Sequence, residues 1–377
     1  MADLDDPVEL SWQQVLGWRL LRQFLHGPRG FAPAADSPAE VAQRLAGIQA
    51  QVPSAADLAV GVRSRDPVRG AVDAALERRR LVRTWAMRGT LHVLPTTLAP
   101  AYLSLMAATR SWEKPAWQRT FATAAQVDEI SAVIGDVLSG QPLTREELVA
   151  GIISRTGDPS LTTALTSGWG ALLKPLAWQG LLVHGPPQGN RITFTSPPWT
   201  SLPDPDEAAI TVLQAYLGAY GPASPAAFGQ WLSRGATSRA RIQSWFDRIS
   251  EILVPVDVEG ERLWAREEDM IPLVAASPPD PVRLLPAFDQ YVLGPGTAST
   301  AILDTARRPF VSRAADWISP VVISGGRIAG VWDTESGTLS ISWFAEAGPV
   351  PGKELEAESE RIGAFLGEDL TVTISTI

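Results

Sequence analysis

The chain has 377 residues, 45% of them hydrophobic and 19% charged, which is enough for two or three domains that each bury a core. It contains no cysteine, so disulfides, thiolate catalysis and cysteine-ligated metal clusters are excluded. The three histidines are scattered, and we expect no metal or other cofactor. No apolar run reaches 18 residues and the N-terminus is acidic, so the sequence predicts a cytoplasmic protein without a membrane segment or signal peptide.

The net charge of −9 is distributed unevenly along the chain. Residues 16–120 hold 15 arginines and lysines against 7 aspartates and glutamates, whereas residues 121–377 hold 17 against 30. Seven arginines fall within residues 63–83 alone. The acidic total argues against nucleic-acid binding. The local excess of positive charge instead indicates a basic surface that suits a DNA backbone.

Four helix starts and a hairpin make up the first predicted unit. Capping residues and prolines predict that helices begin at Ser11, Ser37, Ser54 and Asp66. The last of these helices is expected to end in the arginine run at residues 78–80. Residues 81–85 and 90–94 then predict two strands, with a turn at residues 87–89 between them.

A second unit repeats this plan. Thr144 and Glu147 form a capping box for a helix that is expected to reach Arg155. A longer helix through Trp169 is predicted to end at Gly180, and residues 181–194 read as strand, turn and strand. A proline-rich linker follows.

A third unit follows the linker. Helices are predicted through residues 212–217, from Ser224 to Leu232 and over residues 238–249, and a hairpin over residues 252–265 closes the unit. Three helix–turn–helix groups that each end in a hairpin indicate winged-helix units, a fold that binds DNA.

The rest of the chain is rich in short strands around Gly325-Gly326, with one late helix. The sequence therefore predicts an α+β, mainly helical protein with three tandem winged-helix units in a C-shaped arrangement and a β-rich C-terminal domain. The expected divisions are residues 1–120, 121–200, 201–278 and 279–377.

Three segments resemble those of a known family. Gln49-Ala50-Gln51 is a Gln-hydrophobic-Gln motif directly after a helix stop, and residues 84–95 contain the series Arg-Gly-Thr-Leu-His. Residues 283–294 are similar to a C-terminal signature. In this order, the segments resemble the AlkZ-type tandem winged-helix bacterial DNA glycosylases over nearly the whole chain. Glutamine rather than aspartate at position 51 resembles the family's branch associated with antibiotic biosynthesis and self-resistance.

The glutamine pair can do limited chemistry by itself. In an extended segment Gln49 and Gln51 project from one face, and each amide offers an acceptor oxygen and two donor hydrogens. Two neutral amides can position a water but are feeble bases. They therefore suit a purine alkylated at N7, which carries a positive charge and departs as a neutral base. Without the family pattern, two surface glutamines after a helix cap are the simpler interpretation.

His92 lies among apolar neighbours. Two interpretations are equally open: it packs in the core, or it orients a water or contacts a phosphate. The family pattern and the charge distribution make eight arginines candidates for DNA backbone contacts. These arginines are Arg63, Arg65, Arg79, Arg80, Arg83, Arg88, Arg239 and Arg241. A solvated helix end is the alternative for the run at residues 78–80.

The sequence predicts a monofunctional DNA glycosylase that acts as a monomer on duplex DNA carrying a bulky alkylpurine, in the cytoplasm at the nucleoid. No lysine lies near the glutamine pair, which disfavours a Schiff-base lyase. The main alternative is a non-catalytic winged-helix regulator. A protein that sequesters the free DNA-reactive compound is a second alternative.

Overall fold

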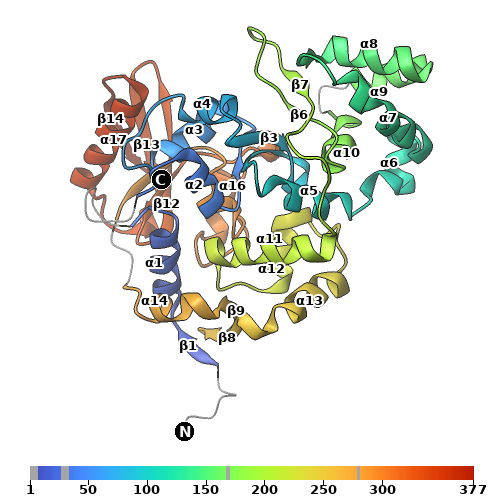
Figure 1. The fold of residues 1–377 in the computed structure, drawn as a ribbon. Helices are drawn as coiled ribbons and strands as arrows, with labels where there is room; N and C mark the ends of the chain where they lie inside the picture. The colour runs from blue at the N-terminus through green and yellow to red at the C-terminus, as the bar shows by residue number, and fades with distance from the viewer. Residues whose placement is uncertain (1–6, 27–33, 167–169, 278–280) are drawn as a thin grey trace.

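The computed structural model describes residues 7–26, 34–166, 170–277 and 281–377, and in this part of the chain three helical groups each end in a β-hairpin. Figure 1 shows α7 (Ala124–Val137), α8 (Arg145–Thr156) and α9 (Thr162–Thr166) of the second group at the upper right, away from the C-terminal sheet, with the third group at the bottom. This arrangement confirms the prediction of an α+β, mainly helical protein with a β-rich C-terminal domain.

The first unit begins with a capped helix, as its sequence predicts, because the Ser37 side chain accepts a hydrogen bond from Glu40 N. Its elements are α2 (Pro38–Arg44), β2 (Ile48–Gln49), α3 (Pro53–Gly61), α4 (Ala71–Glu77), β3 (Leu81–Trp85) and β4 (Leu91–Pro95). The prediction that the fourth helix begins at Asp66 is wrong. Asp57 accepts hydrogen bonds from Gly70 N and Val72 N. The acceptor for the backbone N–H groups at the start of α4 therefore lies in α3.

The second unit confirms the capping box at Thr144 and Glu147. Its elements are α7 (Ala124–Val137), β5 (Leu143–Thr144), α8 (Arg145–Thr156), α9 (Thr162–Thr166), α10 (Leu173–Trp178), β6 (Val183–His184) and β7 (Thr193–Thr195). The long helix expected before Gly180 is only the short α10, since Gly170 has a positive φ of 62°. Trp169, through which that helix was expected to run, lies outside the described residues.

The third unit also receives the N-terminal segment of the chain. Its elements are α11 (Pro205–Tyr220), α12 (Pro225–Ser233), α13 (Arg239–Arg248), β8 (Leu253–Val258) and β9 (Glu261–Arg266). β1 (Val8–Leu10) pairs in parallel with β8, and α1 (Trp12–Arg22) contacts α11. This pairing corrects the prediction that the first residues belong to the first unit. The boundaries at 120, 200 and 278 stay predictions.

A common pairing relates the three units. In each of them, a short segment between the first and second helix pairs with the second strand of the hairpin. The pairs are Gln49 with His92, Thr144 with Thr193, and Ala223 with Trp264. Gln49 therefore occupies a fixed place in a winged-helix unit, at the strand that links the helices to the hairpin.

The hairpins of the first two units form one sheet. Its order is β2-β4-β3-β6-β7-β5, and the two halves meet where Arg83 pairs with His184. The helices α5 (Ala99–Ala107) and α6 (Pro115–Thr120) connect these halves along the chain.

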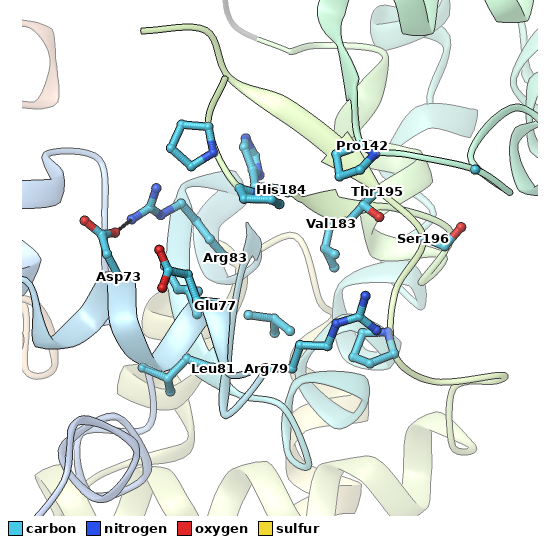
Figure 2. A pocket seen from close by; sticks show the side chains of 17 residues that line it. Asp73, Glu77, Arg79, Leu81, Arg83, Pro142, Val183, His184, Thr195 and Ser196 are labelled. Carbon is cyan, nitrogen blue, oxygen red and sulfur yellow. Dashed lines mark hydrogen bonds and ion pairs between the residues drawn. The ribbon is translucent and has the colours of Figure 1, made fainter. Parts of the chain in front are cut away.

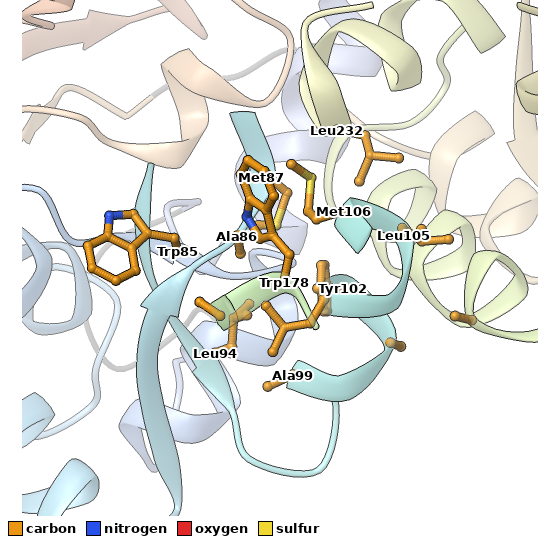
Figure 3. Packing of buried hydrophobic residues seen from close by; sticks show 14 of the residues in the cluster. Trp85, Ala86, Met87, Leu94, Ala99, Tyr102, Leu105, Met106, Trp178 and Leu232 are labelled. Carbon is orange, nitrogen blue, oxygen red and sulfur yellow. The ribbon is translucent and has the colours of Figure 1, made fainter. Parts of the chain in front are cut away.

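The turn of the first hairpin packs against the other units, whereas in a winged helix this turn commonly reaches DNA. Met87 is buried, and Arg88 and Gly89 are half-buried. Met87 belongs to a hydrophobic cluster that also holds Trp178 of the second unit and Leu232 of the third (Figure 3). A side chain at Gly89 would lie 3.4 Å from the Trp178 ring. The first hairpin therefore packs between the other two units.

The C-terminal domain has a five-stranded sheet whose last strand was not predicted. Its strands are β10 (Arg283–Leu285), β11 (Val321–Ser324), β12 (Arg327–Glu335), β13 (Thr338–Trp343) and β14 (Thr371–Thr376), in that spatial order. β14 pairs in parallel with β13, after α17 (Gly352–Leu366) has crossed between them. The remaining helices are α14 (Met270–Val274), α15 (Gln290–Leu293) and α16 (Arg308–Val311).

Candidate active site

The two glutamines of the motif are held by the same hairpin. The Gln49 side chain is 6% exposed, and its Oε1 accepts a hydrogen bond of 3.0 Å from Arg88 Nη2. Gln51 is exposed, and its Oε1 accepts a hydrogen bond of 3.1 Å from the backbone N–H of Leu91. Each carbonyl oxygen retains a second lone pair. Both amides are therefore oriented and keep capacity for a further polar ligand.

Strand register places a polar cluster on one face of the sheet. Residues that lie directly opposite each other on neighbouring strands share a face. Gln49 opposes His92, and His92 opposes Thr84. The Thr84 hydroxyl is buried and has no hydrogen-bond partner among the described residues. Sequence reasoning missed Thr84, although the alternation of β3 against His92 could have indicated it.

Arg88 is half-buried and joins this cluster. Its Nη1 donates a hydrogen bond of 2.7 Å to the backbone carbonyl of Trp231 in α12, and its Nη2 also lies 3.5 Å from His92 Nε2. Burial lowers the pKa of Arg88 to about 10, so the guanidinium stays charged at neutral pH. This position disagrees with the prediction that Arg88 contacts a phosphate.

His92 is a neutral, buried side chain. It is 0% exposed, and its Nδ1 lies 2.9 Å from the carbonyl oxygen of Thr90. Burial first, and then the positive charge of Arg88, lower the pKa of His92 to about 3. Because the carbonyl can only accept, Nδ1 carries the proton and Nε2 faces Arg88 as an acceptor. His92 is thus suited to hold Arg88, not to transfer protons near neutral pH.

The lowered pKa of His92 predicts a loss of stability in acid. The unfolded chain binds a proton at this histidine below about pH 6.5, whereas the folded chain does not until about pH 3. Each unit by which the pH falls in this window should therefore shift the folding equilibrium toward the unfolded state by about tenfold, through this histidine alone. We expect urea titrations between pH 7 and 4 to show a shallower pH dependence for His92→Gln than for the wild type. Identical slopes would contradict a neutral buried His92.

The structure corrects the prediction for Arg63. Its side chain is 0% exposed and forms a bidentate ion pair with Asp289, with both N–O distances at 2.7 Å. A third hydrogen bond of 2.9 Å goes to the carbonyl oxygen of Ala59. A guanidinium that is buried and paired in this way is not available to a DNA phosphate.

The other candidate arginines lie nearer the surface. Arg79, Arg80 and Arg239 are exposed. Arg65 is paired with Asp36 on the surface at 2.9 Å. Arg241 lies 3.5 Å from Asp206 and stacks over the Trp245 ring.

Arg83 lies on the opposite face of the sheet from the glutamine pair. It opposes Val93 and His184, whereas Gln49 opposes His92. On this face α4, β3, β6 and β7 line a partly open cavity of about 450 Å³ (Figure 2). Arg79 and Arg83 line it, and Arg83 is paired there with Asp73 at 3.2 Å. The structure therefore brings Gln49, His92 and Arg88 together and separates them from Arg83.

No helix in the described part of the chain has the length and apolarity that a membrane crossing requires. No group of three or more histidine, aspartate or glutamate side chains there could hold a metal ion.

The repeated plan of helices and hairpin, with a polar cluster on the linking strand of the first unit, defines a tandem winged-helix protein. The family model described as DNA glycosylase AlkZ-like matches residues 42–365. The chain therefore belongs to the AlkZ-like DNA glycosylase family and is a hydrolase that acts on N-glycosyl bonds in DNA.

A relative and a solved structure support this assignment. The chain is 45% identical over 367 residues to a Streptomyces sahachiroi protein named interstrand DNA cross-link repair glycosylase, covering 96% of this chain and 98% of the relative. It is also similar to the structure of the Streptomyces sahachiroi DNA glycosylase AlkZ. That match has a TM-score of 0.93 and 44% identity, and it covers 98% of this chain and 100% of the other.

Proposed function

We propose that this glycosylase hydrolyses the N-glycosidic bond of bulky alkylated purines, above all N7-alkylguanine, and leaves an abasic site. The observation that carries this proposal is that the site presents neutral side chains in place of a carboxylate. Gln49 and Gln51 are two oriented neutral amides, and no carboxylate hydrogen-bonds to either of them among the described residues.

The substrate class follows from what neutral amides can do. A carboxylate stabilises the developing positive charge on the sugar, and a strong base activates water, but amides do neither well. An N7-alkylated purine needs less help because it is already cationic and leaves as a neutral base. The protein then mainly has to hold the sugar and a water in a reactive arrangement. Gln49 and Gln51 are the residues proposed to place that water.

A lyase step is not part of this proposal. A Schiff base with the sugar requires an amine close to the reacting carbon. The chain has only three lysines, Lys114, Lys174 and Lys353, and among the described residues none hydrogen-bonds to Gln49 or Gln51. The enzyme is therefore proposed to be monofunctional.

The relative's name extends the proposal to crosslinks. That protein is named for repair of interstrand DNA crosslinks, and it covers almost all of this chain. We infer that this chain also releases crosslinked purines, and that it protects its host against a DNA-reactive natural product. It would act as a monomer, in the cytoplasm at the nucleoid.

Six arginines are proposed to contact the DNA backbone. Arg65, Arg79, Arg80 and Arg239 are exposed, and Arg83 and Arg241 are half-buried. Backbone contacts of this kind supply affinity that weakens as salt rises.

The test is release of the base from a defined duplex that carries a single N7-alkylguanine. We expect mass spectrometry to detect the free alkylated base, and alkaline cleavage to detect one abasic site, above the spontaneous loss in the absence of enzyme. An undamaged duplex should yield neither product. Binding of the damaged duplex without release would instead favour a non-catalytic regulator. Tight binding of the free compound alone would favour a sequestering protein.

A further inference from the structure

Arg88 connects the candidate active site to the third unit. One arm of its guanidinium donates to Gln49 Oε1 at 3.0 Å, and the other donates to the Trp231 carbonyl at 2.7 Å. The two acceptors belong to β2 and α12, which are far apart in sequence. The planar fork of an arginine fixes both acceptors relative to each other, which a lysine cannot do.

The backbone at Arg88 is held in a costly conformation. Its φ of 57° lies in the left-handed region, which a residue with a side chain rarely adopts. The neighbouring Met87 is 0% exposed, so the turn is fixed by packing against the other units. Strain of this kind persists where surrounding contacts impose it, and such places are often functional sites.

The contacts of Arg88 also select the orientation of the Gln49 amide. Guanidinium nitrogens only donate, so the Gln49 oxygen must face Arg88 and its Nε2 must point away. His92 supports this arrangement because its Nε2 faces the same guanidinium nitrogen as an acceptor. Within the described residues, no carboxylate forms an ion pair with Arg88, so its charge acts on neutral acceptors alone.

We propose that Arg88 is a positioning residue that locks the amide of Gln49 and ties it to the third unit, and that it does not contact the DNA backbone. This inference rests on the proposed role of Gln49. It implies that the arginines near the motif have two different functions, since the exposed Arg80 remains a candidate for phosphate binding.

Two matched variants separate these functions. For Arg88→Met, we expect the single-turnover rate of base release at saturating enzyme to fall at least tenfold. We expect its affinity for an undamaged duplex, and the dependence of that affinity on salt, to equal those of the wild type. For Arg80→Met, we expect the steepness of log affinity against log salt to fall by about 0.9, as one lost phosphate contact requires.

A double-variant cycle tests whether Arg88 acts through Gln49. In the Gln49→Ala background, Arg88→Met should change the single-turnover rate less than twofold, because the group that it positions is absent. An effect of Arg88→Met that is equally large with and without Gln49 would overturn the proposal. A reduced salt slope for Arg88→Met would also overturn it.

Arg88→Lys provides a second test if Arg88→Met folds poorly. Lysine keeps the charge but cannot bridge both acceptors, so we expect a lower rate with an unchanged salt slope. Wild-type activity for Arg88→Lys would contradict the inference. Absence of base release by the wild type would instead refute the proposed function, so the two failures are distinguishable.

Discussion

We expect the Arg63→Met variant to lose about 3–5 kcal/mol of its free energy of unfolding. Arg63 and Asp289 are both fully buried, and their bidentate contacts at 2.7 Å are the main compensation for removing two charges from water. Methionine fills much of the space but leaves the Asp289 carboxylate buried and without its cation. Urea unfolding at neutral pH measures the loss.

Two comparisons make the prediction for Arg63 specific. Arg65→Met, two residues away, removes a pair whose side chains are 58% and 74% exposed, and we expect little change in stability from it. The double variant Arg63→Met with Asp289→Leu should recover part of the loss, since no unpaired buried charge remains. If Arg63→Met were as stable as Arg65→Met, the Arg63–Asp289 ion pair would not be a major contributor to the free energy of unfolding.

The Arg63–Asp289 pair also explains why residues 283–294 form a recognisable segment. Asp289 contacts the first unit, while the next residue, Gln290, lies 3.4 Å from the hydroxyl of Tyr220 in the third unit. Gly294 leaves room for the Tyr220 ring, because a Cβ there would lie 2.2 Å from it. This segment therefore connects the C-terminal domain to two of the winged-helix units.

Local signals in the sequence were sufficient to locate most elements of the fold. The capping boxes at Ser11 and Thr144 form as expected, because both partners lie within one helical turn. The first hairpin also forms where alternation and a Gly-containing turn predict it. The helix α4 starts later than expected because the side chain that accepts hydrogen bonds from its first turn is Asp57 in α3, which lies 13 residues before Gly70.

The roles of the arginines could not be predicted in the same way. Arg63 and Arg65 are alike in sequence context, yet the partner of Arg63 is 226 residues away. Arg88 lies at a hairpin turn, a place where winged helices meet DNA, and only the packing of the other two units against that turn places it beside Gln49. Local sequence carries no information about such distant partners.

Substitution of the glutamine pair should have the largest effect on activity. We expect Gln49→Ala and Gln51→Ala each to lower the single-turnover rate of base release by about 100-fold, the usual effect of removing one oriented hydrogen-bonding group from an active site. Because both amides are proposed to place one water, the double variant should lose little more than either single variant. Gln43→Ala, an exposed glutamine on α2, is the matched control and should keep full activity.

The two glutamines differ in burial, and this difference separates their effects. Gln49 is 6% exposed and accepts a hydrogen bond from Arg88, so Gln49→Ala leaves a buried donor unpaired and should also lower stability. Gln51 is exposed, so Gln51→Ala should lose activity without losing stability. Full activity in both variants would place the chemistry elsewhere in the protein. Losses that multiply in the double variant would mean that the two amides act independently, on different groups of the substrate.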